Sequence, residues 1–476
     1  RLYFRGLLKY PYLNLNQMKI NQNIFRAYDI RGIASEDLSD EFVVSLGSAL
    51  SHKIKKLGLK QVVVARDGRL SGARICSTLI ESFLDNGINV KNVGMVPSPL
   101  LYFAVEKFNT KNGVMITGSH NPKEYNGFKI ILGGKTIYGQ EIQNIKNDIL
   151  QGTHSKEIQK GNLEEIDILD DYINELKNNI SLKRSMKICL DCGNGVGGVI
   201  APQAFKEIGC EVVELFSKVD GNFPNHHPDP GNPKNLEDLQ SKIKESNADI
   251  GIALDGDADR VGIVDNSGKI IYPDIQMILY AGQVLEKNKN ATIIFDVKCS
   301  NVLKNFIEEN SGVAYMSKTG HSYIKKNLFE RKALLAGEMS GHIFFKDRWF
   351  GFDDAIYAGS RMLEILSEKK KSSSDVFSEL PQNLSTPEIN ISVSDENKFS
   401  IISKLIKILE KESGEISSLD GIRIDKDCCW GLVRASNTSP NLVLRFEGNS
   451  PQDLDDIKNV FKKAISKVDN TIKTNF

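Results

Sequence analysis

The sequence lacks any apolar run close to the roughly 20 residues that a membrane-spanning helix needs. It also lacks net charge, because 61 basic side chains balance 61 acidic ones. A neutral chain has little overall electrostatic attraction to nucleic acids or to anionic lipid surfaces. We therefore expect neither a nucleic acid nor a membrane as a partner. The hydrophobic content of 40% is ordinary for a globular protein.

The seven cysteines lack the regular spacing of a disulfide framework. Cys428 and Cys429 are neighbours, and the others are scattered through strand-like and helix-like segments. We expect reduced thiols and a cytoplasmic location, because disulfides are rare in that compartment. Cys189 and Cys192 form a C-x-x-C, but no second pair completes a zinc site, which leaves a redox motif as an alternative interpretation.

A chain of 476 residues is too long for one hydrophobic core, so we expect three or four domains. Position 1 lacks an initiator methionine, and Met18 is the first methionine. We expect residues 1–17 to be a disordered segment or one foreign to the native chain, and we exclude it from fold reasoning.

Strand, acid and helix follow one another three times along the chain. The apolar runs "VVVARD", "MKICLD" and "ATIIFD" end in Asp67, Asp191 and Asp296, and each precedes a helical pattern. Short apolar strands that alternate with helices are typical of mostly parallel sheets, whose functional loops lie at the carboxyl ends of the strands.

The last hundred residues have a different pattern. "TPEINISV", "GIRID", "CWGLVRAS" and "NLVLRFEG" read as strands, with helices at 397–412 and 451–468. The charged, serine-rich "SEKKKSSSDVFSEL" before them is typical of a linker. The predicted fold is α/β: three similar α/β domains with mixed, mostly parallel sheets, then an α+β domain. We expect the four domains at 18–155, 156–267, 268–375 and 376–476.

The segment "GIALDGDADRVGIVD" is a candidate metal site. Asp255, Asp257 and Asp259 follow an apolar strand at alternate positions, and three carboxylates so close together are costly unless a cation neutralises them. An EF-hand loop is excluded, because its glycine and glutamate positions hold Arg260 and Asn266. A small set of hard oxygen ligands from the protein is typical of a Mg²⁺ ion that also contacts a phosphate. The alternative is a solvated acidic turn.

Ser119 stands in "GVMITGSHNPKEYNGFKI", in a turn between two apolar strands. A turn serine is usually structural, and a serine is a weak nucleophile unless it is activated. A Mg²⁺ site elsewhere in the chain changes this, since Mg²⁺ beside a phosphorylated serine is a phosphoryl-transfer centre. No G-x-x-x-x-G-K-[ST] loop occurs, so a nucleotide phosphate donor is not indicated.

Two further polar loops fit such a centre. "LLAGEMSGHIFF" places a glutamate, a serine and a histidine at alternate positions, which would point the same way in an extended loop and suit sugar hydroxyls. "VRASNTSPNLVLRFEG" places an arginine, hydroxyls and backbone N–H groups in a turn, which suits a phosphate. Each loop by itself is equally compatible with an ordinary polar surface loop.

Together, these motifs resemble the α-D-phosphohexomutases, and most closely the bacterial phosphomannomutase/phosphoglucomutase branch. The similar segments are "TGSHNPKEYNGFK", "DGDADR", "GEMSGH" and "RASNTSPNLVLRFEG", with "IFRAYDIRG", "DVKCS" and "KTGHSYIKK" in support. The resemblance runs from Asn23 to Phe461. It implies four domains around a central cleft, which contribute in chain order a phosphoserine loop, a metal-binding loop, a sugar-binding loop and a phosphate-binding loop.

The resemblance also implies residue roles. Ser119 would carry the phosphoryl group, and a phosphoserine oxygen would join the three aspartates as ligands of Mg²⁺. His120 and Lys129 would flank the phosphoserine, with Lys129 as one acid/base candidate and His342 as the other. Residues expected to hold charge near the transferred phosphoryl group are Arg31 and Arg260. Residues expected to bind substrate are Tyr28, Lys298, His321, Glu338, Ser340, His342, Arg434, Ser436, Asn437 and Thr438.

The implied reaction interconverts hexose 1-phosphate and hexose 6-phosphate of mannose, glucose or both. It runs through a hexose 1,6-bisphosphate, and glucose or mannose 1,6-bisphosphate is the expected activator. The expected partners are hexose phosphates, and the expected oligomeric state is a monomer or weak homodimer.

Two alternatives belong to other functional classes. In a haloacid-dehalogenase-like phosphatase, Asp255 would be the nucleophile and Asp257 the acid/base, with Asp353 and Asp354 as later metal ligands. That family has threonine or valine where Asp259 stands, and it leaves the other loops unexplained. A non-catalytic sugar-phosphate sensor would retain binding without turnover.

Overall fold

The structure is a computed structural model that describes residues 20–152, 159–436, 439–474 and 476. The predicted extension at 1–17 and the predicted substrate residues Asn437 and Thr438 lie outside these ranges. The chain divides into two compact units, and each is described by itself. The first unit spans Arg1–Val96 and Ala104–Asp167, and the second spans Pro97–Phe103 and Ile168–Phe476.

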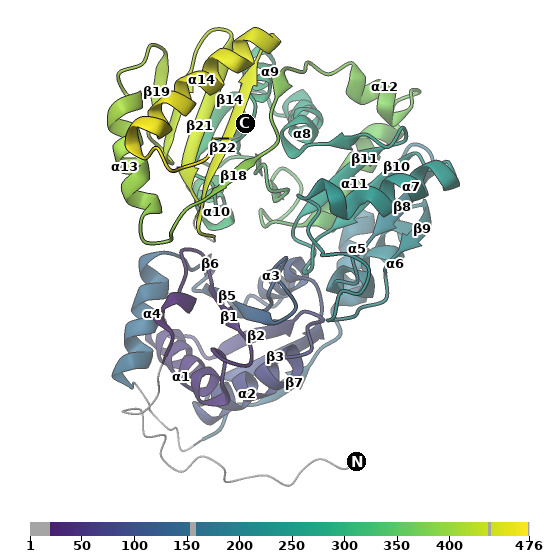
Figure 1. The fold of residues 1–476 in the computed structure, drawn as a ribbon. Helices are drawn as coiled ribbons and strands as arrows, with labels where there is room; N and C mark the ends of the chain where they lie inside the picture. The colour runs from purple at the N-terminus through teal and green to yellow at the C-terminus, as the bar shows by residue number, and fades with distance from the viewer. Residues whose placement is uncertain (1–19, 153–158, 437–438, 475) are drawn as a thin grey trace. The chain divides into compact units, whose positions relative to one another are not determined.

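The first unit holds a mixed seven-stranded sheet in the order β1-β5-β4-β2-β3-β7, with β6 beside β5 (Figure 1). Its strands are β1 (Ile30–Ile33), β2 (Gln61–Arg66), β3 (Asn89–Met95), β4 (Gly113–Ile116), β5 (Tyr125–Leu132), β6 (Lys135–Thr136) and β7 (Leu163–Glu165). Its helices are α1 (Asp40–Lys56), α2 (Gly72–Asp85), α4 (Gln140–Gln151) and the 3₁₀ turn η2 (Gln22–Ile24). β4 and β5 are antiparallel neighbours, so the turn that joins them lies at the carboxyl end of β4.

The second unit begins with a five-stranded sheet in the order β12-β11-β10-β8-β9. Its strands are β8 (Met186–Asp191), β9 (Cys210–Leu215), β10 (Ile250–Leu254), β11 (Val261–Asp265) and β12 (Ile270–Ile271). Its helices are α5 (Leu169–Asn179), α6 (Ala201–Glu207) and α7 (Glu237–Ser246), with 3₁₀ turns η3 (Val196–Val199) and η4 (Pro233–Leu236). The first half of α3 (Ser98–Lys107) also belongs to this unit. β10 is buried throughout, as its apolar run predicts, and delivers the acidic loop at its end.

A third sheet has four strands in the order β14-β13-β15-β16. They are β13 (Thr292–Asp296), β14 (Val313–Ser317), β15 (Leu335–Gly337) and β16 (Ile343–Phe345). The helices of this part are α8 (Pro273–Lys287), α9 (Asn301–Glu309), α10 (His321–Glu330) and α11 (Ala355–Ser367). β13 runs parallel to β14 and β15, while β15 and β16 form an antiparallel pair.

The last sheet is antiparallel throughout, in the order β17-β22-β21-β20-β19 with β18 beside β22. Its strands are β17 (Leu384–Ser385), β18 (Ile389–Ser392), β19 (Glu415–Ser417), β20 (Ile422–Asp425), β21 (Cys429–Ala435) and β22 (Asn441–Gly448). α13 (Lys398–Leu409) and α14 (Pro451–Val468) lie against this sheet (Figure 1). The predicted α/β fold with a closing α+β domain is confirmed.

The linker prediction for "SEKKKSSSDVFSEL" is wrong in its local structure. The segment contains α12 (Ser373–Ser378), and its start is anchored because Oγ of Ser373 donates to the carbonyl of Asp249 at 2.6 Å. Ser372 caps this helix, since its side chain accepts a hydrogen bond from the backbone N–H of Asp375. Serine and charge mark helix caps as well as linkers, which is why composition misled the prediction.

Buried arginines join the last sheet to the third. The Arg423 guanidinium donates to the carbonyls of Val297 and Cys299 at 2.6 and 2.9 Å. Arg445 pairs with Asp274 at 2.8 Å. These contacts position the loops of the last two sheets relative to each other, and any swing of the last domain has to break them.

Candidate functional site

Ser119 occupies a strained turn in the first unit. Its backbone φ is +48°, a left-handed conformation that costs a non-glycine residue free energy and is common at functional sites. Its N–H donates to Oγ1 of Thr117 at 2.8 Å, and its Oγ lies 3.1 Å from Nδ1 of His120. The side chain is only 2% exposed. The hydroxyl is therefore held in one place, next to an imidazole that can exchange a proton with it.

A buried arginine that the sequence analysis missed builds this turn. The Arg69 guanidinium donates to four turn carbonyls, those of Ser119, Asn121, Pro122 and Tyr125, at 2.6–2.9 Å. Next to the turn, a Cβ added to Gly118 would lie 2.4 Å from Cζ of Arg69, so only glycine fits there.

The carboxylate of Asp67 holds the other side of the same turn. It accepts hydrogen bonds from Oγ1 of Thr117 at 2.8 Å and from the N–H of Gly118 at 3.2 Å, and it also pairs with Arg69. The acid at the end of "VVVARD" was a signal in the sequence, but its partners lie about fifty residues away. Spacing alone could not reveal them.

The other predicted residues of the first unit lie on neighbouring elements. Lys129 is 3% exposed in β5, the strand that follows the Ser119 turn. Arg31, in β1, donates to Oδ1 of Asn121 at 2.7 Å and pairs with Asp29. Tyr28 is half-buried just before β1. β1 and β5 are paired, so Arg31 and Lys129 come to the same part of the sheet.

In the second unit, the β10–β11 loop gathers three fully buried carboxylates. Asp255, Asp257 and Asp259 are each 0% exposed, and they offer ligand atoms within 4.8 Å of one another. Oδ1 of Asp255 accepts from the N–H groups of Asp259 and Arg260 at 3.0 and 3.1 Å. Oδ2 of Asp257 accepts from Oγ of Ser98 at 2.6 Å.

This donor set fits a small, hard cation. Burying three carboxylates side by side is unfavourable unless positive charge compensates them, and carboxylate oxygens are the ligands that Mg²⁺ prefers. Ala258, between two of the aspartates, has φ +58°, so the backbone bends sharply to bring the carboxylates together. Burial lowers the pKa of Arg260, but Asp229, Asp255 and Asp259 outweigh it and raise that pKa. The alternative interpretation, a solvated acidic turn, is excluded by this burial.

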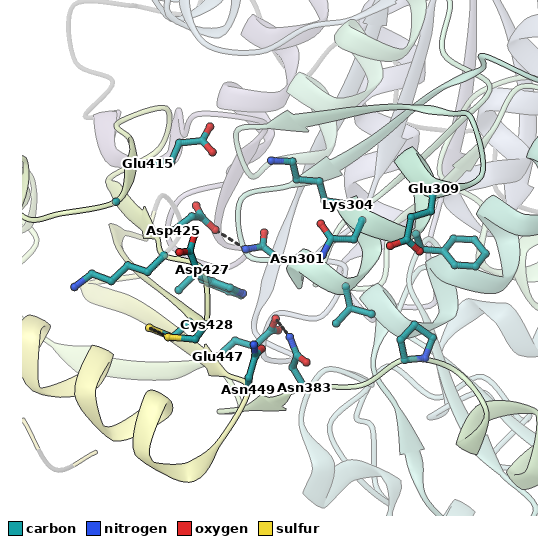
Figure 2. Close-up of a pocket in the computed structure, with 18 of the residues that line it drawn as sticks. Asn301, Lys304, Glu309, Asn383, Glu415, Asp425, Asp427, Cys428, Glu447 and Asn449 are labelled. Carbon is teal, nitrogen blue, oxygen red and sulfur yellow. Dashed lines mark hydrogen bonds between the residues drawn. The ribbon is translucent and has the colours of Figure 1, made fainter.

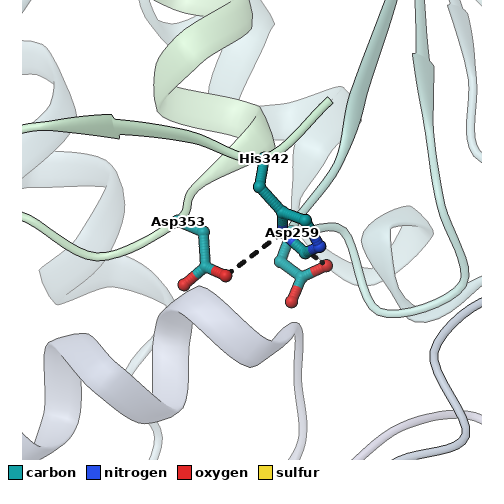
Figure 3. A group of neighbouring side chains, drawn as sticks. All are labelled: Asp259, His342 and Asp353. Carbon is teal, nitrogen blue, oxygen red and sulfur yellow. Dashed lines mark ion pairs between the residues drawn. The ribbon is translucent and has the colours of Figure 1, made fainter. Parts of the chain in front are cut away.

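His342 stands beside this loop. Nε of Arg260 donates to Nε2 of His342 at 3.0 Å. Nδ1 of His342 lies 3.5 Å from Oδ1 of Asp259 and 3.1 Å from Oδ2 of Asp353 (Figure 3). His321 stacks on the His342 ring with 5.5 Å between centroids. The two predicted histidines are therefore brought together.

Asp353 is the anionic partner of this histidine pair. Its carboxylate is fully buried, with Oδ1 2.8 Å from Nζ of Lys325 and Oδ2 3.7 Å from Nδ1 of His321. Burial raises the pKa of Asp353, but Lys325 and His342 outweigh it and hold that pKa well below its usual range. Sequence reasoning considered Asp353 only as a metal ligand of a different enzyme class, and it did not consider Lys325.

Asp354 has a structural role. It caps α11, accepting from the N–H of Tyr357 at 3.0 Å, and it accepts from the Tyr172 hydroxyl at 2.8 Å and from Nε1 of Trp349 at 3.1 Å. Burial raises the pKa of Asp354 to about 6. These partners occupy the carboxylate, so the alternative assignment of Asp354 as a metal ligand is wrong.

The "GEMSGH" loop differs from the predicted extended geometry. It is a tight turn between β15 and β16, in which the N–H of Gly341 donates to the Glu338 carbonyl at 3.0 Å. Oγ of Ser340 donates to the Glu338 carboxylate at 3.1 Å, while the His342 ring contacts Arg260. Gly341, at φ +96°, permits the reversal. Glu338 and Ser340 still meet, but through a turn and not through alternation.

Lys298 is a buried cation with two carboxylates beside it. Its Nζ lies 2.8 Å from Glu388 and 3.9 Å from Asp296. Burial lowers the pKa of Lys298, but Glu388 and Asp296 outweigh it and raise that pKa, so the side chain stays charged. Burial raises the pKa of Glu338, and Asp296 adds to this, while His342 and Lys298 oppose it.

The predicted phosphate-binding loop is linked to the sugar-binding loops through Asp420. Nε of Arg434 lies 2.9 Å from Oδ2 of Asp420, which also accepts from the N–H of Thr319 at 3.1 Å. The next N–H along the chain, that of Gly320, donates to Glu338 at 3.1 Å. Ser436 accepts hydrogen bonds from Ser439. The Asp420 carboxylate thus contacts both Arg434 and the segment that precedes His321.

A separate cavity of about 830 Å³ lies between α9 and the β20–β21 turn (Figure 2). β21 is antiparallel to both neighbours, so this turn lies at the opposite end of the strand from Arg434. None of the predicted site residues that the structure describes lines this cavity.

All seven cysteines are free thiols, as predicted. Burial raises the pKa of both Cys189 and Cys192. A reactive thiol needs a lowered pKa, so this C-x-x-C lacks the character of a redox pair. In the part of the chain that the structure describes, no helix is both long and apolar enough to span a bilayer.

Comparisons with known proteins cover nearly the whole chain. Four families match, described as phosphoglucomutase/phosphomannomutase α/β/α domains I, II and III and C-terminal domain, over residues 22–156, 170–268, 272–384 and 388–464. The chain is 50% identical over 459 residues to the phosphomannomutase/phosphoglucomutase of Pseudomonas aeruginosa, covering 95% of this chain and 98% of that protein. It is 49% identical over 455 residues to a phosphoglucomutase of Neisseria meningitidis, covering 95% and 99%.

A solved structure from Burkholderia thailandensis, described as a phosphoglucomutase/phosphomannomutase family protein, is also similar. Its TM-score is 0.90 at 43% identity, and the match covers 96% of this chain and 99% of that one.

Proposed function

The chain belongs to the phosphoglucomutase/phosphomannomutase family, and from this premise we propose how its residues interconvert hexose 1-phosphates and hexose 6-phosphates. Ser119 carries a phosphoryl group and gives it to the free hydroxyl of a hexose monophosphate. The resulting 1,6-bisphosphate reorients in the site and then returns its other phosphate to Ser119. The single observation that carries this proposal is the strained, fully hydrogen-bonded Ser119 turn, since strain of this kind persists where function requires it.

We propose that a proton moves with each phosphoryl transfer. The sugar hydroxyl oxygen bonds to phosphorus while its proton passes to Nε2 of His342. The bond between phosphorus and Oγ of Ser119 breaks, and His120, whose Nδ1 lies 3.1 Å from that oxygen, supplies the proton that Oγ takes up. Lys129 and Arg31 offset negative charge on the transferred group. In the return half-reaction each proton moves the opposite way.

Asp255, Asp257 and Asp259 would hold Mg²⁺, with a phosphoserine oxygen as a further ligand. The ion supplies charge stabilisation to the transferred phosphoryl oxygens. Arg260 adds positive charge beside the carboxylates of Asp255 and Asp259. A 1,6-bisphosphate of glucose or mannose serves as activator, because it phosphorylates Ser119 when the intermediate escapes.

The remaining loops bind substrate. Glu338 and Ser340 are joined by a hydrogen bond and offer acceptors and a hydroxyl to the sugar. Lys298 and His321 contact the sugar phosphate, while Arg434 and the loop from Ser436 to Thr438 hold the phosphate that is not transferred. A guanidinium is suited to that task, because it can donate two parallel hydrogen bonds to a phosphate.

We also propose that glucose and mannose phosphates turn over at comparable rates in a cytoplasmic enzyme that is a monomer or weak homodimer. The relative from Pseudomonas aeruginosa is named for both sugars, which supports the first part. A coupled assay with each 1-phosphate and a trace of bisphosphate tests it. A bias above about a hundredfold, equivalent to ~2.7 kcal/mol, would contradict it.

The phosphoserine itself is tested by intact-protein and peptide mass spectrometry. One phosphate should map to Ser119 after incubation with glucose 1,6-bisphosphate, and Ser119→Ala should lose nearly all activity while it stays folded. Ser403→Ala, on the exposed side of α13, is the matched control and should be fully active. An adduct that hydroxylamine cleaves and that maps to Asp255 would show an aspartyl-phosphate enzyme instead.

A further inference from the structure

The hydrogen bond between Arg260 and His342 determines where the imidazole proton is. Nε of an arginine can only donate, and it lies 3.0 Å from Nε2 of His342. Nε2 must therefore present its lone pair, and the ring proton must be on Nδ1. A proton on Nε2 would point directly at the Arg260 N–H.

Nδ1 of His342 faces two buried carboxylates, and they are not equivalent. Asp259 belongs to the acidic loop, where Asp255 and Asp257 lie beside it, and it is also grouped with His342 and Asp353. Asp353 is nearer, with Oδ2 3.1 Å from Nδ1 against 3.5 Å for Oδ1 of Asp259 (Figure 3). Asp353 is therefore the nearer acceptor for the Nδ1 proton, and it stabilises the same tautomer that the Arg260 hydrogen bond requires.

Asp353 is itself held by Lys325. Nζ of Lys325 lies 2.8 Å from Oδ1 of Asp353, and the ammonium also sits over the Tyr102 ring, 4.1 Å from its centroid. Lys325 is 7% exposed, and Asp353 is fully buried. One carboxylate oxygen thus lies beside the ammonium and the other beside the imidazole, so the positive charge of Lys325 favours this orientation of the carboxylate.

We propose that Asp353, oriented by Lys325, is a positioning residue that keeps the proton of His342 on Nδ1 and its lone pair on Nε2. The N–H of Arg260 occupies that lone pair in this structure, so a sugar hydroxyl has to displace it before the proton can pass to Nε2. This inference rests on the proposed acid/base role of His342 and goes beyond it, because it assigns a task to two residues outside the predicted site.

Asp353→Asn distinguishes this role from simple packing. The amide has the shape of the carboxylate, but only its oxygen can face the Lys325 ammonium. Its NH₂ group must then face Nδ1 of His342 and donate to it. That forces the ring proton onto Nε2, which breaks the hydrogen bond from Arg260 and removes the lone pair that the reaction needs.

The neighbouring Asp354→Asn is the matched control. Asp354 is equally buried and undergoes the same chemical change, but its partners are Tyr172, Trp349 and the start of α11. We expect Asp353→Asn to lower kcat by about 100-fold with KM within about threefold of wild type. Asp354→Asn should leave both constants within about threefold.

The tautomer is measured without turnover by long-range ¹H–¹⁵N NMR of ¹⁵N-histidine-labelled protein, with His342 assigned from a His342→Gln variant. Wild type and Asp354→Asn should show Nδ1–H, and Asp353→Asn should show Nε2–H. An Nε2–H form in wild type, or an Nδ1–H form retained in Asp353→Asn, would overturn the inference whatever the activity.

Adding Lys325→Met to Asp353→Asn provides a rescue test. Without the ammonium the amide can turn its oxygen to Nδ1, so the Nδ1–H form and part of kcat should return. If the Nε2–H form persists in the double variant, Lys325 does not orient Asp353. If the single variant changes tautomer while kcat stays at the wild-type value, the acid/base role of His342 is wrong, and the positioning role falls with it.

Discussion

Nε of Arg434 lies 2.9 Å from Oδ2 of Asp420, so the guanidinium proposed to bind phosphate already contacts a carboxylate. A substrate phosphate has to compete with Asp420 for Arg434. We expect Arg434→Ala to raise KM for hexose monophosphate and to increase release of the 1,6-bisphosphate per turnover. A charge-assisted hydrogen bond contributes about 1.5–3 kcal/mol, which corresponds to roughly 10- to 150-fold in KM.

Asp420→Asn is the matched variant for this pair. It keeps an acceptor for the N–H of Thr319 but removes the charge that competes with phosphate, so KM should fall. Loss of phosphoryl transfer at saturating substrate in Arg434→Ala, with KM unchanged, would instead assign Arg434 to the chemical step.

Removal of a metal ligand should affect activity and metal binding together. Asp257→Asn removes one of three converging charges, so we expect at least a 100-fold (~2.7 kcal/mol) loss of activity and weaker Mg²⁺ binding by calorimetry. Ser98→Ala removes only the 2.6 Å hydrogen bond to Asp257 and should weaken Mg²⁺ binding by roughly 10- to 100-fold. Excess Mg²⁺ should restore Ser98→Ala but not Asp257→Asn. Full activity of the wild type in excess chelator would exclude a metal role.

Arg69 should control both the stability and the phosphorylation of the Ser119 turn. Arg69→Met leaves Asp67 buried without its cationic partner and removes the donor of four carbonyls. Breaking such a buried pair costs about 3–5 kcal/mol, so thermal unfolding should occur at markedly lower temperature.

Arg69→Lys separates the two effects of that arginine. It keeps the charge, but a single ammonium cannot span the four carbonyls. We therefore expect a folded protein that incorporates little phosphate from the bisphosphate, by mass spectrometry. Arg74→Met, whose side chain is 42% exposed, should change the unfolding free energy by less than about 1 kcal/mol. Normal phosphorylation of Arg69→Lys would refute the role of Arg69 in shaping the turn.

Asp354 predicts a pH dependence of stability. Burial raises its pKa from an ordinary 3.8 to about 6, so the folded state binds the proton more tightly than the unfolded state does. The stabilisation from protonation is therefore complete below pH ~4 and is lost as pH rises through about 6, and the full change is about 3 kcal/mol. Asp354→Asn cannot titrate. The midpoint temperature of unfolding of the variant, minus that of the wild type, should therefore rise between pH 4 and pH 7. A difference that stays constant over this pH range would contradict the prediction.

Prediction from sequence succeeded where local chemistry is decisive. The run Ile250–Leu254 is a buried strand, and the three aspartates after it converge, with ligand atoms within 4.8 Å of one another. The closing helix at 451–468 was predicted with the bounds that the structure has. The turn at Ser119 followed from two apolar strands with turn residues between them.

Prediction failed where a residue acts through partners distant in the chain. The serine-rich segment became α12 because Ser373 finds Asp249, and the "GEMSGH" loop became a turn because β15 and β16 pair closely around it. Arg69 and Lys325 were missed, and the partners of Asp67 were not predicted, since nothing in a local pattern distinguishes a buried charge from an exposed one.

The sequence by itself thus determined the family and the order of the loops, through motifs that resemble those of the family. It also determined which groups can carry charge, because strand periodicity and clustered carboxylates are local properties. Only the tertiary structure decided which of those charges are paired. Asp353 and Asp354 are adjacent in sequence, yet one faces the His342 imidazole and the other caps α11. Burial removes water as an alternative partner, so each buried ionisable group takes its role from the few atoms that the fold brings within hydrogen-bonding distance.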